Sequence, residues 1–211
     1  MKIINKKSLV MTVLAIGLSS SAFAHHDRKS ALIENAPSLD RVFVHKENVS
    51  FDGMGGSDID GFSIGGSKRL SKHTFVFGEG SKTSEKIDNL EYDFDRYSVG
   101  LGYTRSINHT TNIYAGVSYE QMDSKVVAID SGSKITDTNT SGHGFQVGMK
   151  HMYYDLLEVD GKIYLRDYGD VEHSGVEVGA NYFIQKDLSV GINYENNSDY
   201  EQYGFGLAFH F

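Results

Sequence analysis

The side chains that could do chemistry in this chain are nine histidines, 28 acids and many serines, with no cysteine. A hydrolase would need a nucleophile such as serine beside a histidine base that an acid orients. The sequence has no G-x-S-x-G motif, and its histidines do not recur at metal-ligand spacing. His143, His151 and His173 are the three that could approach one another, and scattered surface histidines are the simpler interpretation. We therefore expect no enzyme and no catalytic residue.

Metal sites built from nitrogen or oxygen ligands were considered next. The motif His25-His26-Asp27 could bind Cu or Zn weakly if it became a new N-terminus. The acidic segments 57–60 and 88–95 could offer oxygen ligands to Ca²⁺, but neither has EF-hand spacing. Solvated acidic loops, bridged by divalent ions to lipid phosphates, explain both segments. The sequence therefore predicts no cofactor and no resident metal.

A third group of charges lies within segments where apolar and polar residues alternate. Buried charges persist only with partners, so four bases and four acids on one face favour a paired network. The alternative is a narrow polar pathway for small solutes or ions. The predicted members of this polar network are Arg96, Glu120, Lys150, Glu158, Asp160, Lys162, Arg166 and Glu177.

The elements that must position these charges are strands. From residue 60 onward, apolar residues occupy every second position for eight to ten residues at a time, which places them on one face of a strand. With the weaker candidates 41–51 and 73–80, the count is ten strands. The connections alternate between short turns and longer polar loops, and the longer ones are expected at residues 52–58, 81–93, 123–141, 167–172 and 196–201. Both chain ends are then expected on the periplasmic side, with the longer loops facing outward.

An even number of strands joined by alternating short and long connections is typical of an up-and-down outer-membrane barrel. A soluble β-sandwich also alternates, but its outer face carries bulky charged residues. Here the face opposite the apolar one is rich in glycine, which suits the lumen of a narrow closed barrel. Tyrosines at strand ends fit a membrane girdle. We expect an all-β, closed antiparallel transmembrane β-barrel of ten strands, with eight as the alternative.

Both ends of the chain carry export signals. Lys2, Lys6 and Lys7 precede a short apolar stretch that ends in Ala22-Phe23-Ala24, the pattern of a signal-peptidase site. The expected organisation is a signal peptide over 1–24, a periplasmic leader over 25–38 and the barrel over 39–211. The last strand resembles the terminal signal that the barrel assembly machinery recognises, through alternating apolar residues at Tyr203, Phe205, Leu207, Phe209 and Phe211.

The sequence also resembles a family. The stretches 60–70, 97–103 and 188–194 (DGFSIGGSKRL, YSVGLGY and LSVGINY) are similar to those of the small OmpA-like and Ax21-like outer-membrane barrels. The resemblance covers nearly the whole mature chain and implies fold and location more than activity. The familiar OmpA-type barrels have eight strands, which departs from the ten counted here.

Charge limits the partners. Without the three signal lysines, 17 basic residues (20 minus 3) face 28 acidic ones, which argues against nucleic acid. We expect a monomer in the outer membrane, in contact with lipids and lipopolysaccharide and handled during biogenesis by periplasmic chaperones and the barrel assembly machinery. The expected function is a structural or surface-interaction role with a lumen plugged by paired charges. The alternative is a narrow porin-like channel.

Overall fold

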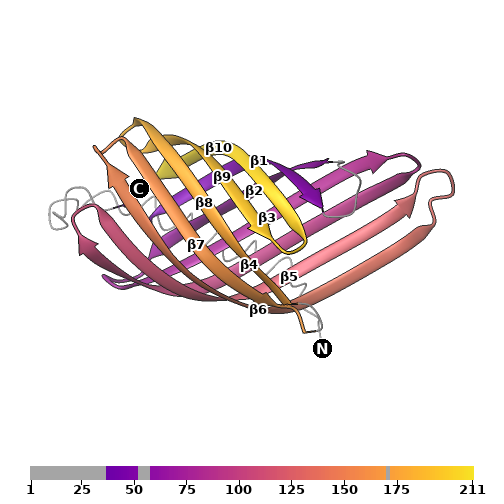
Figure 1. Cartoon of the computed structure of the whole chain (residues 1–211), viewed down its shortest axis with the longest axis horizontal. Helices are drawn as coiled ribbons and strands as arrows, with labels where there is room; N and C mark the ends of the chain where they lie inside the picture. Colours follow the sequence, from indigo (N-terminus) through magenta and orange to yellow (C-terminus); the bar gives the residue numbers. More distant parts are fainter. Residues whose placement is uncertain (1–36, 52–57, 170–171) are drawn as a thin grey trace.

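The computed structural model describes residues 37–51, 58–169 and 172–211, and all that follows concerns these residues. The predicted cleavage site at Ala22 and Ala24, the His25-His26-Asp27 motif and most of the leader lie outside them. Ten strands make up the fold (Figure 1). Their bounds are β1 Arg41–Phe51, β2 Asp58–Arg69, β3 Thr74–Ile87, β4 Leu90–Asn108, β5 Thr111–Ala128, β6 Lys134–Tyr153, β7 Leu157–Asp167, β8 Glu172–Gln185, β9 Leu188–Asn197 and β10 Tyr200–His210. In this described part, no helix is long and apolar enough to cross a membrane.

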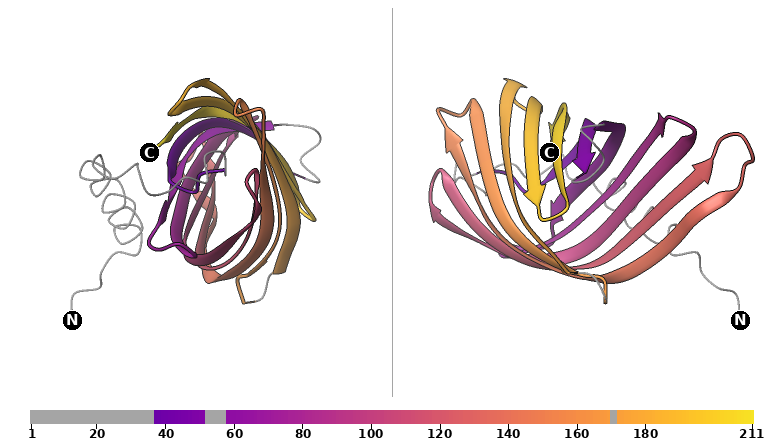
Figure 2. Two further views of the ribbon diagram at one scale, coloured as in Figure 1. Left: turned by 90° about the vertical axis from the view of Figure 1, so that its left-hand side faces the viewer. Right: turned by 45° about the vertical axis from the view of Figure 1, so that its right-hand side comes forward.

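The strands close into one antiparallel barrel. Each strand pairs with the next along the chain, and β1 pairs with β10 from Arg41↔His210 to Phe51↔Tyr200. Closure leaves no free edge in the body of the barrel, so the backbone groups of its wall are satisfied without water. The view along the barrel shows the ring of strands (Figure 2). The predicted closed barrel of ten strands is confirmed, and the eight-strand alternative is wrong.

The alternation produces two opposite faces. Large apolar side chains point outward, and many are about half exposed, such as Phe62 at 55%, Val117 at 60% and Phe205 at 62%. Charged side chains point inward and are buried, as at Glu47, Glu158 and Glu195. An apolar exterior around a charged interior is stable only where the surrounding solvent is apolar, as in a bilayer.

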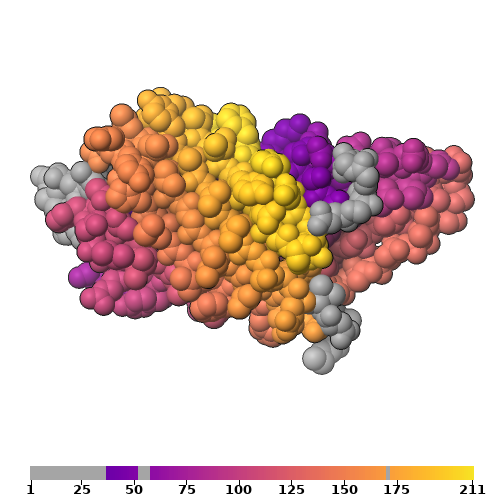
Figure 3. All heavy atoms as spheres, viewed as in Figure 1, coloured from indigo at the N-terminus to yellow at the C-terminus, as the bar shows by residue number. Residues whose placement is uncertain are grey.

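The strands are unequal in length. Strands β1, β9 and β10 have 10 or 11 residues, which suffices to cross a bilayer at a barrel's tilt, whereas β4, β5 and β6 have 19, 18 and 20. Their extra residues, with the end of β3, form a sheet that extends past the rim (Figures 1 and 3). We call this projection, residues 82–95 and 122–142, the extracellular sheet, after the expected orientation with both chain ends on the periplasmic side.

The extracellular sheet corrects two sequence predictions. Residues 81–93 and 123–141 were expected to be loops, but they are strands joined by tight turns at Asp88 and around Gly132. Asp88 has a φ of 54°, which suits a two-residue hairpin turn. The two tips are linked, because Asn89 Nδ2 donates a hydrogen bond to Asp130 Oδ2 at 2.5 Å. Residues 134–139 escaped prediction because they are exposed and mostly polar on both faces of the strand. Leu90, Tyr92 and Phe94 do alternate with acidic residues, a signal that the loop prediction overlooked.

An aromatic cluster lies in the periplasmic half of the interior. Phe75 and Tyr114 are buried with Leu39, and Phe77 packs against them. Glycine makes room for this cluster: a Cβ at Gly102 would lie 2.3 Å from the Phe75 ring. Glycine on the inner face therefore accommodates large neighbours, as expected for a narrow lumen, although here those neighbours are aromatic rings.

Candidate functional site

The interior near the extracellular rim is organised around one carboxylate. Glu195 of β9 is 1% exposed and accepts hydrogen bonds from Arg96 at 3.1 Å, Arg166 at 2.8 Å and both Tyr164 and Tyr200 at 2.7 Å. Arg96 reaches its second oxygen at 3.3 Å and also donates to the Tyr200 hydroxyl. We call these five residues the Glu195 hub. They come from strands β4, β7, β9 and β10, so the hub ties separate parts of the wall together across the lumen.

A second cluster lies toward the periplasmic end. Lys150 Nζ is 2.8 Å from Glu158 Oε1 and 3.4 Å from Asp160 Oδ2, and the Arg41 guanidinium reaches the same two carboxylates at 3.3 and 3.9 Å. Glu158 is fully buried. Such charges tolerate burial because each faces an opposite charge.

Two further contacts lie between these clusters. Lys162 Nζ is 2.6 Å from Glu177 Oε2. Glu120 accepts a 2.6 Å hydrogen bond from the Ser118 hydroxyl and lies 3.9 Å from Arg166. All eight predicted lumen residues therefore lie inside the barrel, and each contacts at least one oppositely charged side chain.

The sequence interpretation missed four charged residues of the interior. Arg41, Glu47 and Glu79 belong to the weaker candidate strands, and Glu195 lies on the polar face of a strand that was recognised. Alternation could have identified them, because each lies an even number of residues from buried neighbours on the same strand. Alternation could not show which side chains meet across the barrel, since that depends on the stagger of the strands.

Two cavities lie between the inward-facing side chains of the described residues. One of about 100 Å³ lies beside Arg41, Lys162 and Glu177, and one of about 30 Å³ lies beside Glu79 and Asn193. Cavities with such polar linings hold ordered water.

The residues that precede β1 pack against the periplasmic end of the barrel. Leu39 is 3% exposed within the aromatic cluster, and the Pro37 carbonyl accepts a 2.8 Å hydrogen bond from Asn112 Nδ2. Asp40 Oδ1 accepts one from the Arg69 backbone at 2.6 Å. The last residues of the predicted leader, Pro37 and Ser38, thus adjoin the barrel mouth and are continuous with its fold.

The other candidate residues do not assemble into a site. His151 bonds to Thr111 at the periplasmic end, while His143 lies eight residues away on β6 at the other end, about 27 Å at strand rise. Asp60, from one proposed Ca²⁺ segment, is paired with Lys46 at 3.0 Å. Across residues 37–51, 58–169 and 172–211, no three His, Cys, Asp or Glu side chains form a metal-binding group. The suggested convergence of His143 with His151 is wrong.

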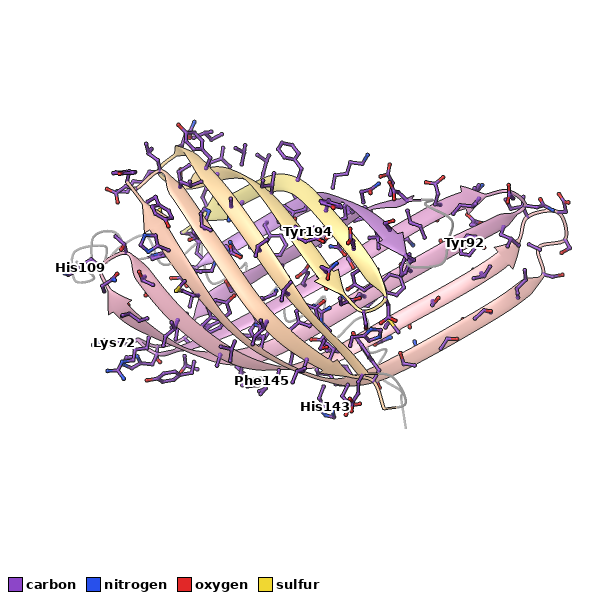
Figure 4. All side chains as sticks on the ribbon, viewed as in Figure 1. Lys72, Tyr92, His109, His143, Phe145 and Tyr194 are labelled. Atoms are coloured by element: carbon purple, nitrogen blue, oxygen red, sulfur yellow. The ribbon has the colours of Figure 1, made fainter. Side chains whose placement is uncertain are left out.

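The apolar residues of the last strand face outward. Tyr203, Phe205, Leu207 and Phe209 are each 46–62% exposed. Phe211 follows the strand, where its backbone donates to the Asp40 carbonyl at 3.1 Å and Lys68 Nζ lies 4.5 Å from its ring centre. Figure 4 labels Lys72 and His109 at this periplasmic end and Tyr92 near the far tip of the extracellular sheet.

Comparison with known proteins agrees with this architecture. Residues 11–211 match the model of the outer membrane protein beta-barrel domain family. The chain is 27% identical over 156 residues to outer membrane porin C of Enterobacter cloacae; the match covers 69% of this chain but only 39% of the porin.

Solved structures of other outer-membrane proteins are similar to this chain at low identity. Ail, the attachment invasion locus protein of Yersinia pestis, is 16% identical with a TM-score of 0.46, over 81% of this chain and 96% of Ail. The KdgM porin, solved with oligogalacturonate, is 9% identical with a TM-score of 0.48, over 81% of this chain and 99% of the porin. The β-barrel domain of OprF from Pseudomonas aeruginosa is 11% identical with a TM-score of 0.43, over 83% of this chain and all of that domain.

The family match spans nearly all of the chain and coincides with a closed barrel whose outer face is apolar. The chain belongs to the outer membrane protein beta-barrel domain family and resides in the outer membrane.

Proposed function

We propose that this protein is a monomeric, non-enzymatic barrel that presents the extracellular sheet as an interaction surface, with its lumen closed by the paired charges. It reaches the outer membrane through its N-terminal signal peptide, periplasmic chaperones and the barrel assembly machinery. Its terminal residues Tyr203 to Phe211 serve as the assembly signal. Lipids and lipopolysaccharide surround its apolar face.

One observation carries the surface role: β4, β5 and β6 continue as ordered strands well beyond the level where β7 to β10 end. Strand β6 begins at Lys134 but pairs with β7 only from His143 onward. At strand rise and a tilt of about 40°, these nine residues project about 20 Å beyond the rim. Because paired strands already hold this sheet in one conformation, a partner can bind without the loss of conformational entropy that ordering a flexible loop requires.

The outer part of β6 presents a free edge within the described structure. Residues 134–139 are exposed, and no described strand pairs with them on the side toward β7. An exposed edge can take an additional strand from a partner through main-chain hydrogen bonds. The side chains here are mostly threonine, aspartate and asparagine, so such a partner would be a polar extended segment.

The closed lumen is supported by the two charge clusters and by the residues at the periplasmic mouth. The Glu195 hub spans the interior near one end, and Leu39 with Phe75 fills the other. To pass, a solute would have to separate several buried ion pairs. A buried charge that loses its partner costs several kcal/mol. This favours the closed barrel over the narrow channel.

The surface role is tested by shortening the extracellular sheet. Ser124 pairs with Thr138 and Asp123 with Asn139, so removing residues 124–138 and joining the ends with an Asn-Gly turn preserves the register. Cells displaying the full chain should adhere to immobilised extracellular proteins or to one another, and cells with the shortened barrel should not. Heat-modifiable gel mobility serves as the folding control. Equal adhesion by both, or none above cells lacking the protein, would refute the role.

A further inference from the structure

The outer part of β6 has an edge that is built for pairing with another strand. Residues 134–139 are exposed, and β7 joins β6 only from His143 onward (Figure 1). Proteins protect exposed edges with prolines, with bulges or with several charges. From Thr136 to Ser141 the sequence is TDTNTS, which has no proline and one charge, and its pairing with β5 is regular from Thr136 onward. This stretch of the edge is therefore open to main-chain hydrogen bonds.

The sequence of this edge is self-complementary. A two-fold antiparallel pairing centred on Thr138 places this threonine opposite its own copy. Thr136 then faces Thr140 on one side of the sheet, and Asp137 faces Asn139 on the other. Threonine pairs across strands are favourable, and no like charges stand directly opposite one another. Moving the centre by one residue, to Asp137, would oppose two carboxylates, so the sequence selects one register.

The single acid of the edge does not repel a second copy. Lys134 Nζ donates a 2.5 Å hydrogen bond to Asp137 Oδ2. Lys125 of β5 lies opposite Asp137 in the register, on the same face of the sheet. Two bases therefore compensate this carboxylate, although the chain as a whole has 28 acids against 20 bases. An edge that is nearly neutral in an acidic protein can approach its own copy closely.

We infer that the partner of this edge is the same edge of a second copy in an opposing membrane, so that two extracellular sheets join into one. The inference rests on the proposed surface role and names its partner. The projection of about 20 Å beyond the rim carries the edge clear of the bilayer. Each copy remains a monomer in its own membrane.

The tilt of the strands explains why the two copies belong to different membranes. Copies in one membrane are related by rotation about the membrane normal, and a two-fold rotation of this kind makes strands tilted by about 40° cross rather than align. Copies in two facing membranes are related by a two-fold axis parallel to the membranes. That axis, perpendicular to the sheet, makes the two β6 strands antiparallel, as the self-complementary register requires.

The test uses the refolded full-length protein in phosphocholine vesicles, and dynamic light scattering follows vesicle aggregation. Protease accessibility measures the fraction of copies whose extracellular sheet faces outward, and heat-modifiable gel mobility verifies folding. Thr138→Lys and Thr138→Glu each place like charges opposite one another when two identical edges pair. Mixing vesicles of the two variants places unlike charges there instead. Ser131→Lys, in the exposed turn before β6, is the matched control for added charge.

Vesicles carrying the wild-type protein or Ser131→Lys should aggregate. Each Thr138 variant alone should aggregate at least about tenfold more slowly, because many opposed pairs form together between two vesicles. A mixture of the two variants should regain the wild-type rate, a recovery that misfolded protein could not produce.

The inference is refuted if wild-type vesicles stay dispersed, if either Thr138 variant alone aggregates like wild type, if Ser131→Lys also abolishes aggregation, or if the mixture does not recover. Its failure is distinguishable from that of the surface role. Cells that adhere to immobilised extracellular proteins while wild-type vesicles stay dispersed would support the surface role and overturn the second copy as its partner.

Discussion

Replacing Glu195 with glutamine probes the interior network at its centre. The substitution keeps the shape and one acceptor oxygen but removes the charge that faces both Arg96 and Arg166. Those two guanidinium groups are buried, with side chains only 7% and 11% exposed. After the change, the remaining acid near Arg166 is Glu120 at 3.9 Å.

Removing one member of a buried ion pair typically costs 3–5 kcal/mol, because the partner charge stays buried without compensation. Here two arginines lose their shared carboxylate, so we expect Glu195→Gln to lower the free energy of unfolding by about 4 kcal/mol. The matched comparison is Glu47→Gln. Both glutamates are 1% exposed, but Glu47 has no hydrogen-bond partner to lose, so its variant should be neutral or stabilising.

Equilibrium unfolding in urea from lipid vesicles, followed by circular dichroism, measures the difference; the chain contains no tryptophan for fluorescence. A loss below about 1 kcal/mol for Glu195→Gln, or equal effects of the two variants, would show that the hub does not hold the barrel together.

Three further predictions concern the wall and the extracellular sheet. Phe205→Arg places a charge on the lipid face, at a side chain that is 62% exposed. In the same urea assay it should lower the free energy of unfolding by about 2–4 kcal/mol, the cost of an arginine near the bilayer midplane. Tyr154→Arg, in an exposed turn, should leave the free energy of unfolding almost unchanged, and equal losses for the two variants would contradict the bilayer assignment. Gly206→Ala should destabilise by about 1–3 kcal/mol, because its Cβ would lie 1.9 Å from the Val44 carbonyl oxygen; a neutral result would mean that β1 and β10 can separate locally. In the extracellular sheet, the Lys134 ammonium donates a 2.5 Å hydrogen bond to Asp137 and lowers the pKa of that carboxyl. In an NMR titration, Lys134→Gln should raise the pKa of Asp137 toward its ordinary value. An unchanged pKa would show that this ion pair does not form in solution.

The wall of the barrel was predictable because a period of two, read over eight to ten residues, assigns each side chain to a face. The inward placement of Arg96, Lys150 and Glu158 follows from that parity alone. Their partners do not, because Arg96 of β4 and Glu195 of β9 meet across the lumen, where the stagger of the strands decides which side chains are level.

The extracellular sheet was not predictable in the same way. Residues 134–140 read as a polar loop because threonine, aspartate and asparagine occur on both faces of the strand. Outside the bilayer neither face needs to be apolar, so the pairing of β5 with β6 is carried by main-chain bonds and by β-favouring threonines. Composition alone does not distinguish such a strand from a loop.

The central claim is that this barrel is closed, and single-channel recording in a planar bilayer tests it most directly. Insertion into the bilayer is verified independently, by recovering the folded, heat-modifiable band from the same bilayer preparation. The wild-type protein, folded by the criterion of heat-modifiable mobility, should give a flat trace under the same conditions. Reproducible conductance steps from the wild-type protein would contradict the closed lumen and establish a channel.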